Sequence, residues 1–336
     1  MTGSDVLNDS DFMRGSRRAF GEAVPHNEWY HFVVHDDHFR LIVNFSVIDR
    51  PDGTAHRVIA LVRHDEWIGV VETFDATECE ARSGRVGARF GPCRFALVDG
   101  TYELTLWLSA IGLRAHLRFA PASIPFVVNN QPLAPGARLS WLFVPRLIAH
   151  GDVWVGTTRT TLHGAPAYHD HNWGRFRWGD DFGWEWGSVL PRDPADPWTI
   201  VCMRMTDRSR RCATRQALYA WHEHEPVALW RDFAMTMEHE GFLRRAPSLT
   251  LPPVMSMLTP GSASDVPARI VIRGRGHDVL EMTFEPAEYV RVVVPDEVDT
   301  MGVVLLNEIS GRIRARGRVA GRDLDVEATG VFELLH

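Results

Sequence analysis

The sequence contains few cysteines and no long apolar run, and both shortages exclude classes of protein. The four cysteines, Cys79, Cys93, Cys202 and Cys212, form no Cys-x-x-Cys pair, which argues against a zinc ribbon or a thioredoxin motif. No apolar stretch approaches the ~20 residues that a membrane-spanning helix needs. The polar, charged start of the chain also lacks the apolar core of a signal peptide. We therefore expect a cytoplasmic protein without an integral membrane segment.

Motifs of several enzyme classes are missing as well. There is no Gly-x-Ser-x-Gly, the nucleophile elbow of α/β-hydrolases, and no Walker A or Rossmann glycine fingerprint. The formal net charge of -7 argues against a nucleic-acid partner, because phosphate binding needs a concentrated basic surface. We interpret the alternating arginines from Arg312 to Arg318 as the solvent face of a strand. No nucleotide, flavin or pyridoxal cofactor is implied, so an enzyme here would act with its side chains alone.

The residues that are present indicate β structure. Short segments rich in Val, Ile, Phe, Trp and Thr dominate the chain from Trp29 onward, and few windows have helical periodicity. Asp99-Gly100 lies between alternating apolar segments and predicts a hairpin. A second hairpin is predicted around the turn at 320–322. The segment 121–136 contains four prolines, so we expect a long irregular connection there.

The number of strand-like segments predicts the domain organisation. About twenty of them, at 8- to 12-residue spacing, indicate sandwiches or barrels and are too many for one small barrel of ~8 strands. The sequence therefore predicts an all-β protein with two antiparallel barrel-like domains. A turn-rich boundary at 191–197 places these domains at residues 21–190 and 191–336. We expect residues 1–20 to form a flexible N-terminus.

The most informative stretch is 167–186, which combines indole rings with titratable groups. Aromatic side chains around a few polar groups are typical of a small-molecule site. If 168–173 is extended, its side chains alternate between two faces. One face then carries Tyr168, Asp170 and Asn172, the other carries His169, His171 and Trp173, and two further indoles follow at Trp184 and Trp186.

Asp170 is the candidate general acid. In a poorly hydrated aromatic pocket desolvation disfavours the carboxylate anion, so the neutral acid could protonate an alkene or polyene, and Tyr168 could orient it. Indoles near the site could stabilise a carbocation through their π faces; the candidates are Trp141, Trp173, Trp184 and Trp186. The competing interpretation is a buried polar network that joins strands or domains.

His169 and His171 have the spacing of a strand-borne metal pair, which Glu185 or Asp180 could complete. Two histidines without a third ligand at defined spacing are a weak signal, so we favour structural hydrogen bonds and expect no metal. Two methionine pairs also alternate along strands, Met203 with Met205 and Met235 with Met237. We interpret them as barrel core, with a ligand pocket in the second domain as the alternative.

The block from Tyr168 to Gly174 resembles the signature of carotenoid 1,2-hydratases (hydroxyneurosporene synthases) and their AttH-like relatives. Glu28-Trp29-Tyr30 resembles the family's N-terminal Glu-Trp-Trp/Tyr element, and the segment 330–333 (Gly-Val-Phe-Glu) resembles its closing strand. The resemblance implies two lipocalin-like β-barrel domains with a hydrophobic pocket in or between them. It also implies hydration or cyclisation of hydrophobic isoprenoid or polyketide chains without a redox cofactor.

The resemblance assigns the proton donor to Asp170, with Tyr168 beside it. The family's upstream His-x-Trp element is matched here by 139–141 (Leu-Ser-Trp), which keeps the tryptophan but not the histidine. We therefore expect a cofactor-independent cyclase or isomerase that acts on a terpenoid or polyketide polyene in natural-product biosynthesis. The alternatives are hydratase-type water addition, a non-catalytic carrier of hydrophobic molecules, and a structural module. The expected substrate contacts are Trp141, His169, His171, Asn172, Trp173, Trp184 and Trp186.

Overall fold

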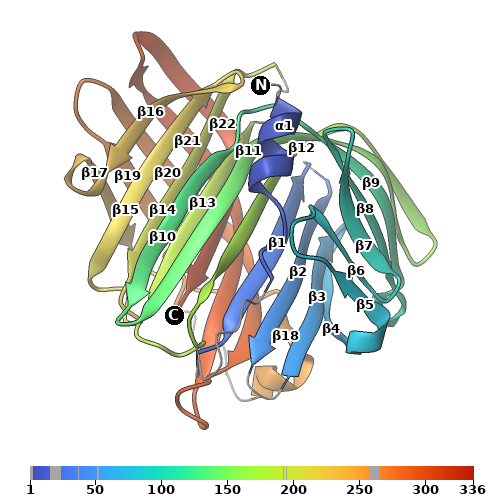
Figure 1. Ribbon diagram of the computed structural model, residues 1–336. Helices are drawn as coiled ribbons and strands as arrows, with labels where there is room; N and C mark the ends of the chain where they lie inside the picture. The colour runs from blue at the N-terminus through green and yellow to red at the C-terminus, as the bar shows by residue number, and fades with distance from the viewer. Residues whose placement is uncertain are drawn as a thin grey trace. The chain divides into compact units, whose positions relative to one another are not determined.

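A computed structural model describes residues 3–15, 24–36, 38–50, 53–191, 193, 195–257 and 265–336. The chain divides into two compact units, Met1–Arg177 and Trp178–His336, and strands form almost all of the regular structure of each (Figure 1). The all-β prediction is confirmed. The division between the units precedes the expected boundary at 190/191. The turn-rich segment 191–197 instead connects two paired strands of the second unit.

The first unit is built on one 12-stranded sheet, whose path is β4-β3-β2-β1-β12-β11-β9-β8-β7-β6-β5, with β10 paired to β11 beside this path. Its strands are β1 (His26–His35), β2 (Arg40–Arg50), β3 (Gly53–Arg63), β4 (Trp67–Phe74), β5 (Cys79–Ala81), β6 (Gly87–Phe90), β7 (Cys93–Val98), β8 (Thr101–Leu108), β9 (Leu113–Pro121), β10 (Phe126–Ala134), β11 (Ala137–Val155) and β12 (Thr158–Arg175). Helix α1 (Gly3–Ser10) and the 3-10 helices η1 (Ala76–Glu78) and η2 (Ser109–Ile111) complete the unit.

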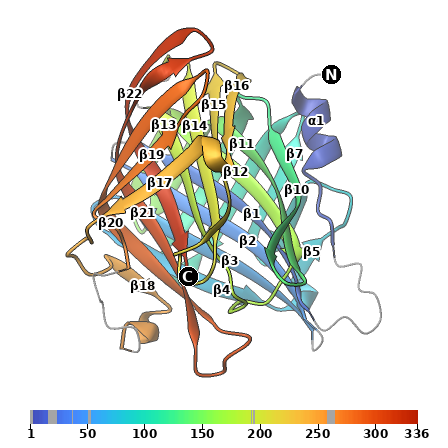
Figure 2. The same ribbon diagram turned by 90° about the vertical axis from the view of Figure 1, so that its left-hand side faces the viewer.

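The second unit is built on a 10-stranded sheet with the path β16-β15-β14-β13-β22-β21-β20-β19-β17, and β18 pairs with β20 in parallel. Figure 2 shows these strands from β13 in yellow-green to β22 in red. They are β13 (Gly183–Pro191), β14 (Trp198–Thr206), β15 (Ala213–His222), β16 (Glu225–Arg231), β17 (Met235–Glu240), β18 (Leu249–Leu251), β19 (Arg269–Gly274), β20 (Val279–Pro295), β21 (Val303–Val319) and β22 (Arg322–Leu335). Two 3-10 helices, η3 (Asp232–Ala234) and η4 (Pro253–Met257), connect them.

The two units share a topology although no sequence repeat is visible. Each begins with a four-stranded meander, and the first strand of that meander pairs with the last strand of the same unit. These pairs are β1 with β12 and β13 with β22, both antiparallel. The junction of first and last strand therefore lies inside each sheet, where a side chain has neighbours on both flanking strands.

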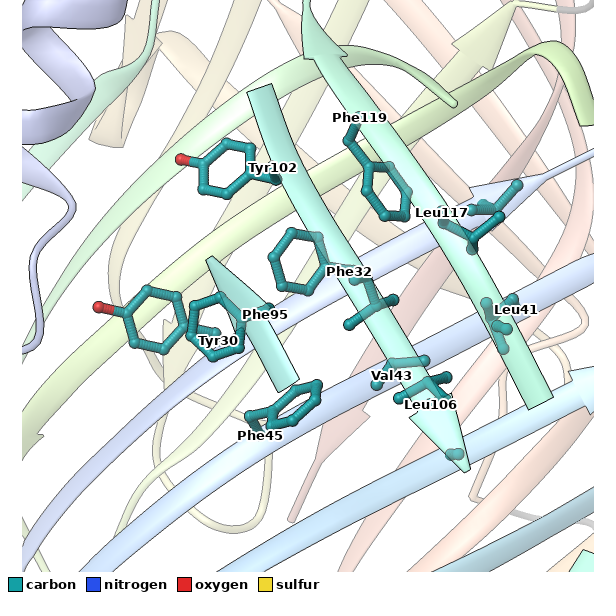
Figure 3. Packing of buried hydrophobic residues seen from close by; sticks show 14 of the residues in the cluster. Tyr30, Phe32, Leu41, Val43, Phe45, Phe95, Tyr102, Leu106, Leu117 and Phe119 are labelled. Carbon is teal, nitrogen blue, oxygen red and sulfur yellow. The ribbon is translucent and has the colours of Figure 1, made fainter. Parts of the chain in front are cut away.

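Aromatic side chains fill the interior of the first unit. Figure 3 shows Phe32, Phe95 and Phe119 packed together, and each is at most 2% exposed. The centroid of the Phe32 ring lies 5.3 Å from that of Phe119 and 5.7 Å from that of Phe95. Burial of one such side chain stabilises a fold by roughly 1.5–3 kcal/mol. The alternating apolar residues of these strands are thus fixed to the inner face of the sheet.

Both predicted hairpins are confirmed. Asp99 and Gly100 connect β7 to β8 with φ of 49° and 75°, and Ala320 and Gly321 connect β21 to β22 with φ of 50° and 74°. Two successive residues with positive φ form a type I′ turn, whose twist matches that of the flanking strands. Asp-Gly suits this turn because both residue types tolerate positive φ.

The N-terminal residues differ from the sequence expectation of a flexible segment over 1–20. Residues 3–10 form helix α1, and Leu7, Asp11 and Met13 are at most 2% exposed. Two apolar side chains and one buried carboxylate hold this segment on the first unit. Residues 1, 2 and 16–20 lie outside the described part of the chain.

The proline-rich segment 121–136 also differs from its prediction, because it contains strand β10. Among the described strands it pairs only with β11, and its register shifts on both sides of Gln131 and Pro132. A strand paired on one side tolerates proline, since an N–H that faces away from the sheet has no ladder bond to make. The irregularity predicted from the prolines is therefore present as bulges within a strand.

The arginines of β21 face solvent, as predicted. Arg312, Arg314 and Arg316 are exposed and pair with acidic side chains of the neighbouring strands β20 and β22. Exposed pairs of this kind contribute about 0–1 kcal/mol each, so the ladder marks the solvent face of the sheet. All four cysteines are free thiols. In the part of the chain that the structure describes, no helix is long and apolar enough to cross a membrane.

Candidate functional site

Strand β12 carries the signature block through the middle of the first sheet. It pairs with β1 on one side and with β11 on the other. The predicted alternation of its faces is confirmed. The rings of His169 and His171 stack on Phe32 and Tyr30 in the interior of the unit, whereas Asp170 and its neighbours two residues away lie on the opposite face.

Both inward histidines bind carboxylates. Nδ1 of His171 lies 3.0 Å from Asp11 Oδ1, and its Nε2 lies 2.8 Å from Glu28 Oε1. His169 places Nε2 3.2 Å from Asp11 Oδ2 and donates from Nδ1 to the carbonyl oxygen of His31 at 2.9 Å. His169, His171, Asp11 and Glu28 form the histidine–carboxylate cluster, and the side chains of all four are fully buried.

Electrostatics favour charged groups in this cluster. Burial alone would raise the pKa of Asp11, but His169 and His171 lower it to about 2. Burial opposes ionisation of Glu28 too, yet hydrogen bonds from His171 and His26 bring its pKa to about 2. Burial disfavours protonated His171, and its bonds to the two carboxylates outweigh that cost and raise its pKa. A carboxylate accepts hydrogen bonds only, so the geometry fits an imidazolium at His171 between two anions.

The cluster holds the N-terminal segment on the barrel. Glu28 accepts the backbone N–H groups of Arg14 at 2.6 Å and of Gly15 at 3.0 Å. Tyr102 donates to Asp11 Oδ2 at 2.5 Å, and Tyr30 donates to the backbone oxygen of Asp11 at 2.8 Å. Figure 3 shows both hydroxyl groups pointing away from the phenylalanine rings.

Three of the predicted substrate contacts therefore interact with other side chains or backbone groups of the first unit. His169 and His171 use all four ring nitrogens within the cluster, and Trp173 lies 4.3 Å beneath the Arg14 guanidinium. The metal alternative named Glu185 or Asp180 as a further ligand of the histidine pair. Glu185 belongs to the second unit, where its carboxylate binds Arg204 at 2.9 Å and His239 at 3.3 Å.

The opposite face of β12 carries Asp170 among aromatic neighbours. Across β1 and β11, Asp170 lies opposite His31 and Phe143. Asn172 lies opposite Trp29 and Trp141 in the next row of the same face. Tyr168 lies on this face as well, two residues from Asp170. The structure thus brings together Tyr168, Asp170, Asn172 and Trp141, four of the predicted site residues.

Asp170 is buried, with 7% of its surface exposed, and Tyr168 and Trp141 are 1% and 5% exposed. The side-chain amide of Asn172 donates to Oδ1 of Asp170. One carboxyl oxygen is therefore held by a neutral donor. This arrangement has the elements that acid catalysis requires, namely a desolvated carboxyl and aromatic rings beside it.

Trp184 and Trp186 lie in the second unit, on β13. The indole N–H of Trp184 donates to Oε1 of Glu333, and Trp186 lies opposite Glu333 on the neighbouring strand β22. Glu333 in turn lies opposite Glu308 of β21. Sequence reasoning assigned no role to either glutamate. A signal existed for Glu333, because it interrupts the apolar run of the last strand between Phe332 and Leu334.

Asp11 is the other residue that sequence reasoning missed. It lies in the polar N-terminal stretch, outside every motif, and its partners His169 and His171 are 158 and 160 residues away in the chain. No local sequence pattern indicates such a contact. Glu28 was visible only as part of a weak resemblance.

The two methionine pairs lie in different surroundings. Met235 and Met237 belong to the core of the second unit, as interpreted from the sequence. Met203 and Met205 lie opposite Trp186 and Trp184 and share their face, so they border the indoles.

A cavity of about 510 Å³ in the first unit is lined by Asn8, Phe95 and arginines that include Arg85 and Arg94. It contains none of the predicted site residues. The hydrophobic pocket therefore remains a prediction.

Comparisons with known proteins agree on the fold. No protein-family model matches the sequence, and no curated protein gives a significant match. A Nitrosomonas europaea protein provisionally assigned as AttH has a similar structure, with a TM-score of 0.63 and 12% identity over 95% of this chain and 98% of that one. Kievitone hydratase of Nectria haematococca gives a TM-score of 0.59 and 11% identity over 92% and 88% of the two chains.

The protein CghA gives a TM-score of 0.58 and 12% identity over 94% of this chain and 88% of its own. CghA has also been crystallised with the compound Sch210972. At these identities the likeness concerns the fold. The chain therefore has the two-domain, lipocalin-like β fold that these solved structures share.

Proposed function

We propose that the protein is an enzyme of the hydratase or cyclase type that acts on a hydrophobic polyene, with Asp170 as the proton donor. The observation that carries this proposal is the buried Asp170 carboxyl, bonded by Asn172 and flanked by Phe143 and His31. The fold supports it, because kievitone hydratase shares that fold. Cyclisation or isomerisation of a terpenoid or polyketide chain is the favoured reaction.

The proposed mechanism starts from neutral Asp170. In this mechanism the carboxyl of Asp170 carries the proton, and the side-chain amide of Asn172 donates to its Oδ1. Transfer of that proton to an alkene carbon leaves a carbocation on the substrate and a carboxylate on Asp170. The faces of Trp141 and Phe143 can stabilise the cation through their π electrons. The cation then loses a proton from a neighbouring carbon after ring closure or double-bond migration, or adds water and releases a proton from it.

Reaction in D₂O tests this proposal. Purified protein is incubated with linear isoprenoid and polyketide polyenes, and products are analysed by mass spectrometry. We expect a product that carries one carbon-bound deuterium. Asp170→Asn should lower turnover about 10²–10⁴-fold, while polyene binding, followed by quenching of tryptophan fluorescence, persists. Asp152→Asn is the matched control, because Asp152 is bound to Arg159 near the surface.

Other results would change the assignment. Full activity of Asp170→Asn rules out Asp170 as the donor. Tight binding of polyenes by the wild type without any product favours a carrier. A product without deuterium indicates shape-directed cyclisation, in which case Trp184→Ala and Trp186→Ala should lower turnover more than Asp170→Asn.

A further inference from the structure

The cavity of about 510 Å³ in the first unit lies beside the loop between β5 and β6, and the proposed function leaves it unused. One acidic residue, Glu80, lines it together with four arginines, Arg82, Arg85, Arg89 and Arg94. We propose that this cavity binds an organic phosphate. Arg85 and Arg94 hold the phosphate group, and an apolar group of the ligand packs on Val86 and Leu97. The site contains none of the residues assigned to the proposed function, so the two stand independently.

The cavity concentrates positive charge in a protein that is acidic as a whole. Four arginines line it with one glutamate, whereas the chain carries a formal net charge of -7. The carboxylate of Glu80 is already used, because it forms an ion pair with Nε of Arg82 at 2.8 Å. A phosphate monoester carries roughly 1.5–2 negative charges near neutral pH. It therefore neutralises more of the remaining positive charge than a single carboxylate does.

Arg85 and Arg94 are the two lining arginines whose guanidinium groups are free to bind an anion. Both are exposed, and among the residues that the structure describes neither side chain has a hydrogen-bond or ion-pair partner. Arg94 lies directly opposite Arg89 across β6 and β7, where like charges destabilise the strand pair. Arg89 is itself held by the backbone oxygens of Glu78 and Gly91, at 3.0 and 3.4 Å. An anion bound beside this fixed charge offsets the repulsion.

Backbone hydrogen bonds hold the wall of the cavity in place. Met13 donates its N–H to the Arg85 oxygen, and Gly84 donates its N–H to the Met13 oxygen, both at 2.8 Å. On the other side of the loop, the N–H of Leu97 donates to the Val86 oxygen at 3.2 Å. The loop that carries Arg85 and Val86 is therefore ordered without a ligand, so binding costs little further ordering of the backbone.

The size and the apolar part of the lining indicate a ligand larger than a phosphate ion. Val86 and Leu97 line the cavity, are half-buried and pack against the core of the first unit. Volumes of roughly 300–1,000 Å³ with apolar walls and a few polar groups are typical of small-molecule sites. Arginine binds phosphate through two parallel N–H···O bonds. The geometry thus fits a phosphate group attached to an apolar chain or ring.

Titration calorimetry with n-hexyl phosphate tests the proposal, in about 0.15 M salt, where screening limits long-range electrostatics to roughly 8 Å. Inorganic phosphate, hexanoate and 1-hexanol are the comparison probes. We expect one hexyl phosphate to bind per chain, at least about 10-fold more tightly than each comparison probe. A protein that shows no saturable binding of hexyl phosphate overturns the proposal. Equal affinity for hexanoate overturns the preference for phosphate, and equal affinity for inorganic phosphate overturns the apolar contact.

Variants of the two free arginines locate the bound molecule. Arg85→Gln and Arg94→Gln should each weaken binding of hexyl phosphate about 10–100-fold. Arg118→Gln is the matched control, because Arg118 is an exposed arginine of the same sheet that pairs with Glu103 at 3.6 Å and does not line the cavity. It removes the same charge and should keep the wild-type affinity. Wild-type affinity in both Arg85→Gln and Arg94→Gln places the ligand elsewhere and overturns the proposal.

A third variant tests the apolar contact. Val86→Ala should weaken binding of hexyl phosphate about 3-fold and leave binding of inorganic phosphate unchanged. An equal loss for both probes means that the apolar group does not pack on Val86. None of these measurements uses a polyene, so their failure and the failure of the proposed function are distinguishable.

Discussion

Asp11 accepts hydrogen bonds from two imidazoles and a phenol, although no sequence motif contains it. The alternation of β12 was predictable, because a strand has a period of two, and it separated the faces of His169 and Asp170 correctly. A hydrogen-bonding role for His169 and His171 was also favoured from the sequence, and both rings make such bonds. Their acidic partners were not predictable, because a contact between Asp11 and His171 depends on the folded sheet and leaves no local trace.

The hydroxyl group of Tyr102 should contribute measurably to stability. It donates to the buried carboxylate of Asp11 at 2.5 Å, and hydrogen bonds to charged groups are worth about 1.5–3 kcal/mol. We expect Tyr102→Phe to lower the free energy of unfolding, measured in urea, by that amount. Tyr289→Phe is the control, because its hydroxyl bonds the Arg245 carbonyl at 3.3 Å and should cost about 1 kcal/mol or less. Equal losses for the two variants would contradict a charged Asp11.

At the scale of elements, the hairpin turns could be predicted from the local sequence, whereas the pairing of strands far apart in the chain could not. The Asp99-Gly100 hairpin follows from two residues that tolerate positive φ. By contrast, the pairing of β1 with β12 joins segments at opposite ends of the first unit. Prolines correctly marked 121–136 as irregular, but a strand paired on one side accommodates them, so β10 was missed.

Strand β11 depends on one glycine where it crosses β9. Gly151 has φ of +127°, and a Cβ there would lie 2.1 Å from the backbone oxygen of His116. Gly151→Ala should therefore push two paired strands apart and lower the free energy of unfolding by more than about 3 kcal/mol.

Gly156→Ala is the control for backbone conformation alone. Its φ is +59° and no atom lies within 4 Å of the added methyl group, so only the left-handed conformation is penalised, by about 1–2 kcal/mol. Denaturation in urea measures both variants. A loss for Gly151→Ala no larger than that of Gly156→Ala would mean that β9 and β11 adjust freely.

At the scale of the whole molecule, the histidine–carboxylate cluster should make stability depend on pH in both directions. Asp11 and Glu28, with folded pKa values of about 2, contribute stability above their unfolded values of about 4, and lose it as the pH falls from about 4 to 2. His171, whose pKa is raised, contributes fully below about 6.5 and loses its contribution as the pH rises through the folded value.

The cluster should therefore stabilise the protein most between about pH 4.5 and 6.5. Urea unfolding from pH 3 to pH 9 measures this profile. Glu28→Gln should flatten the acidic limb, because one of the two titrating carboxylates is gone. The cluster's contribution is the free energy of unfolding of the wild type minus that of Glu28→Gln. A contribution that grows steadily from pH 6 to pH 9 would contradict a charged cluster that holds residues 3–15 on the first unit.

The attachment of residues 3–15 has a consequence for how the chain is made. These residues leave the ribosome long before His169 and His171 are translated, so Asp11 lacks these two partners for about half of the synthesis of the chain. Docking of α1 must wait for β12, and it then closes a loop of about 160 residues. Helix α1 is thus translated first but docks late in the folding of the first unit. Until it docks, the charged groups that the cluster later buries are exposed to water.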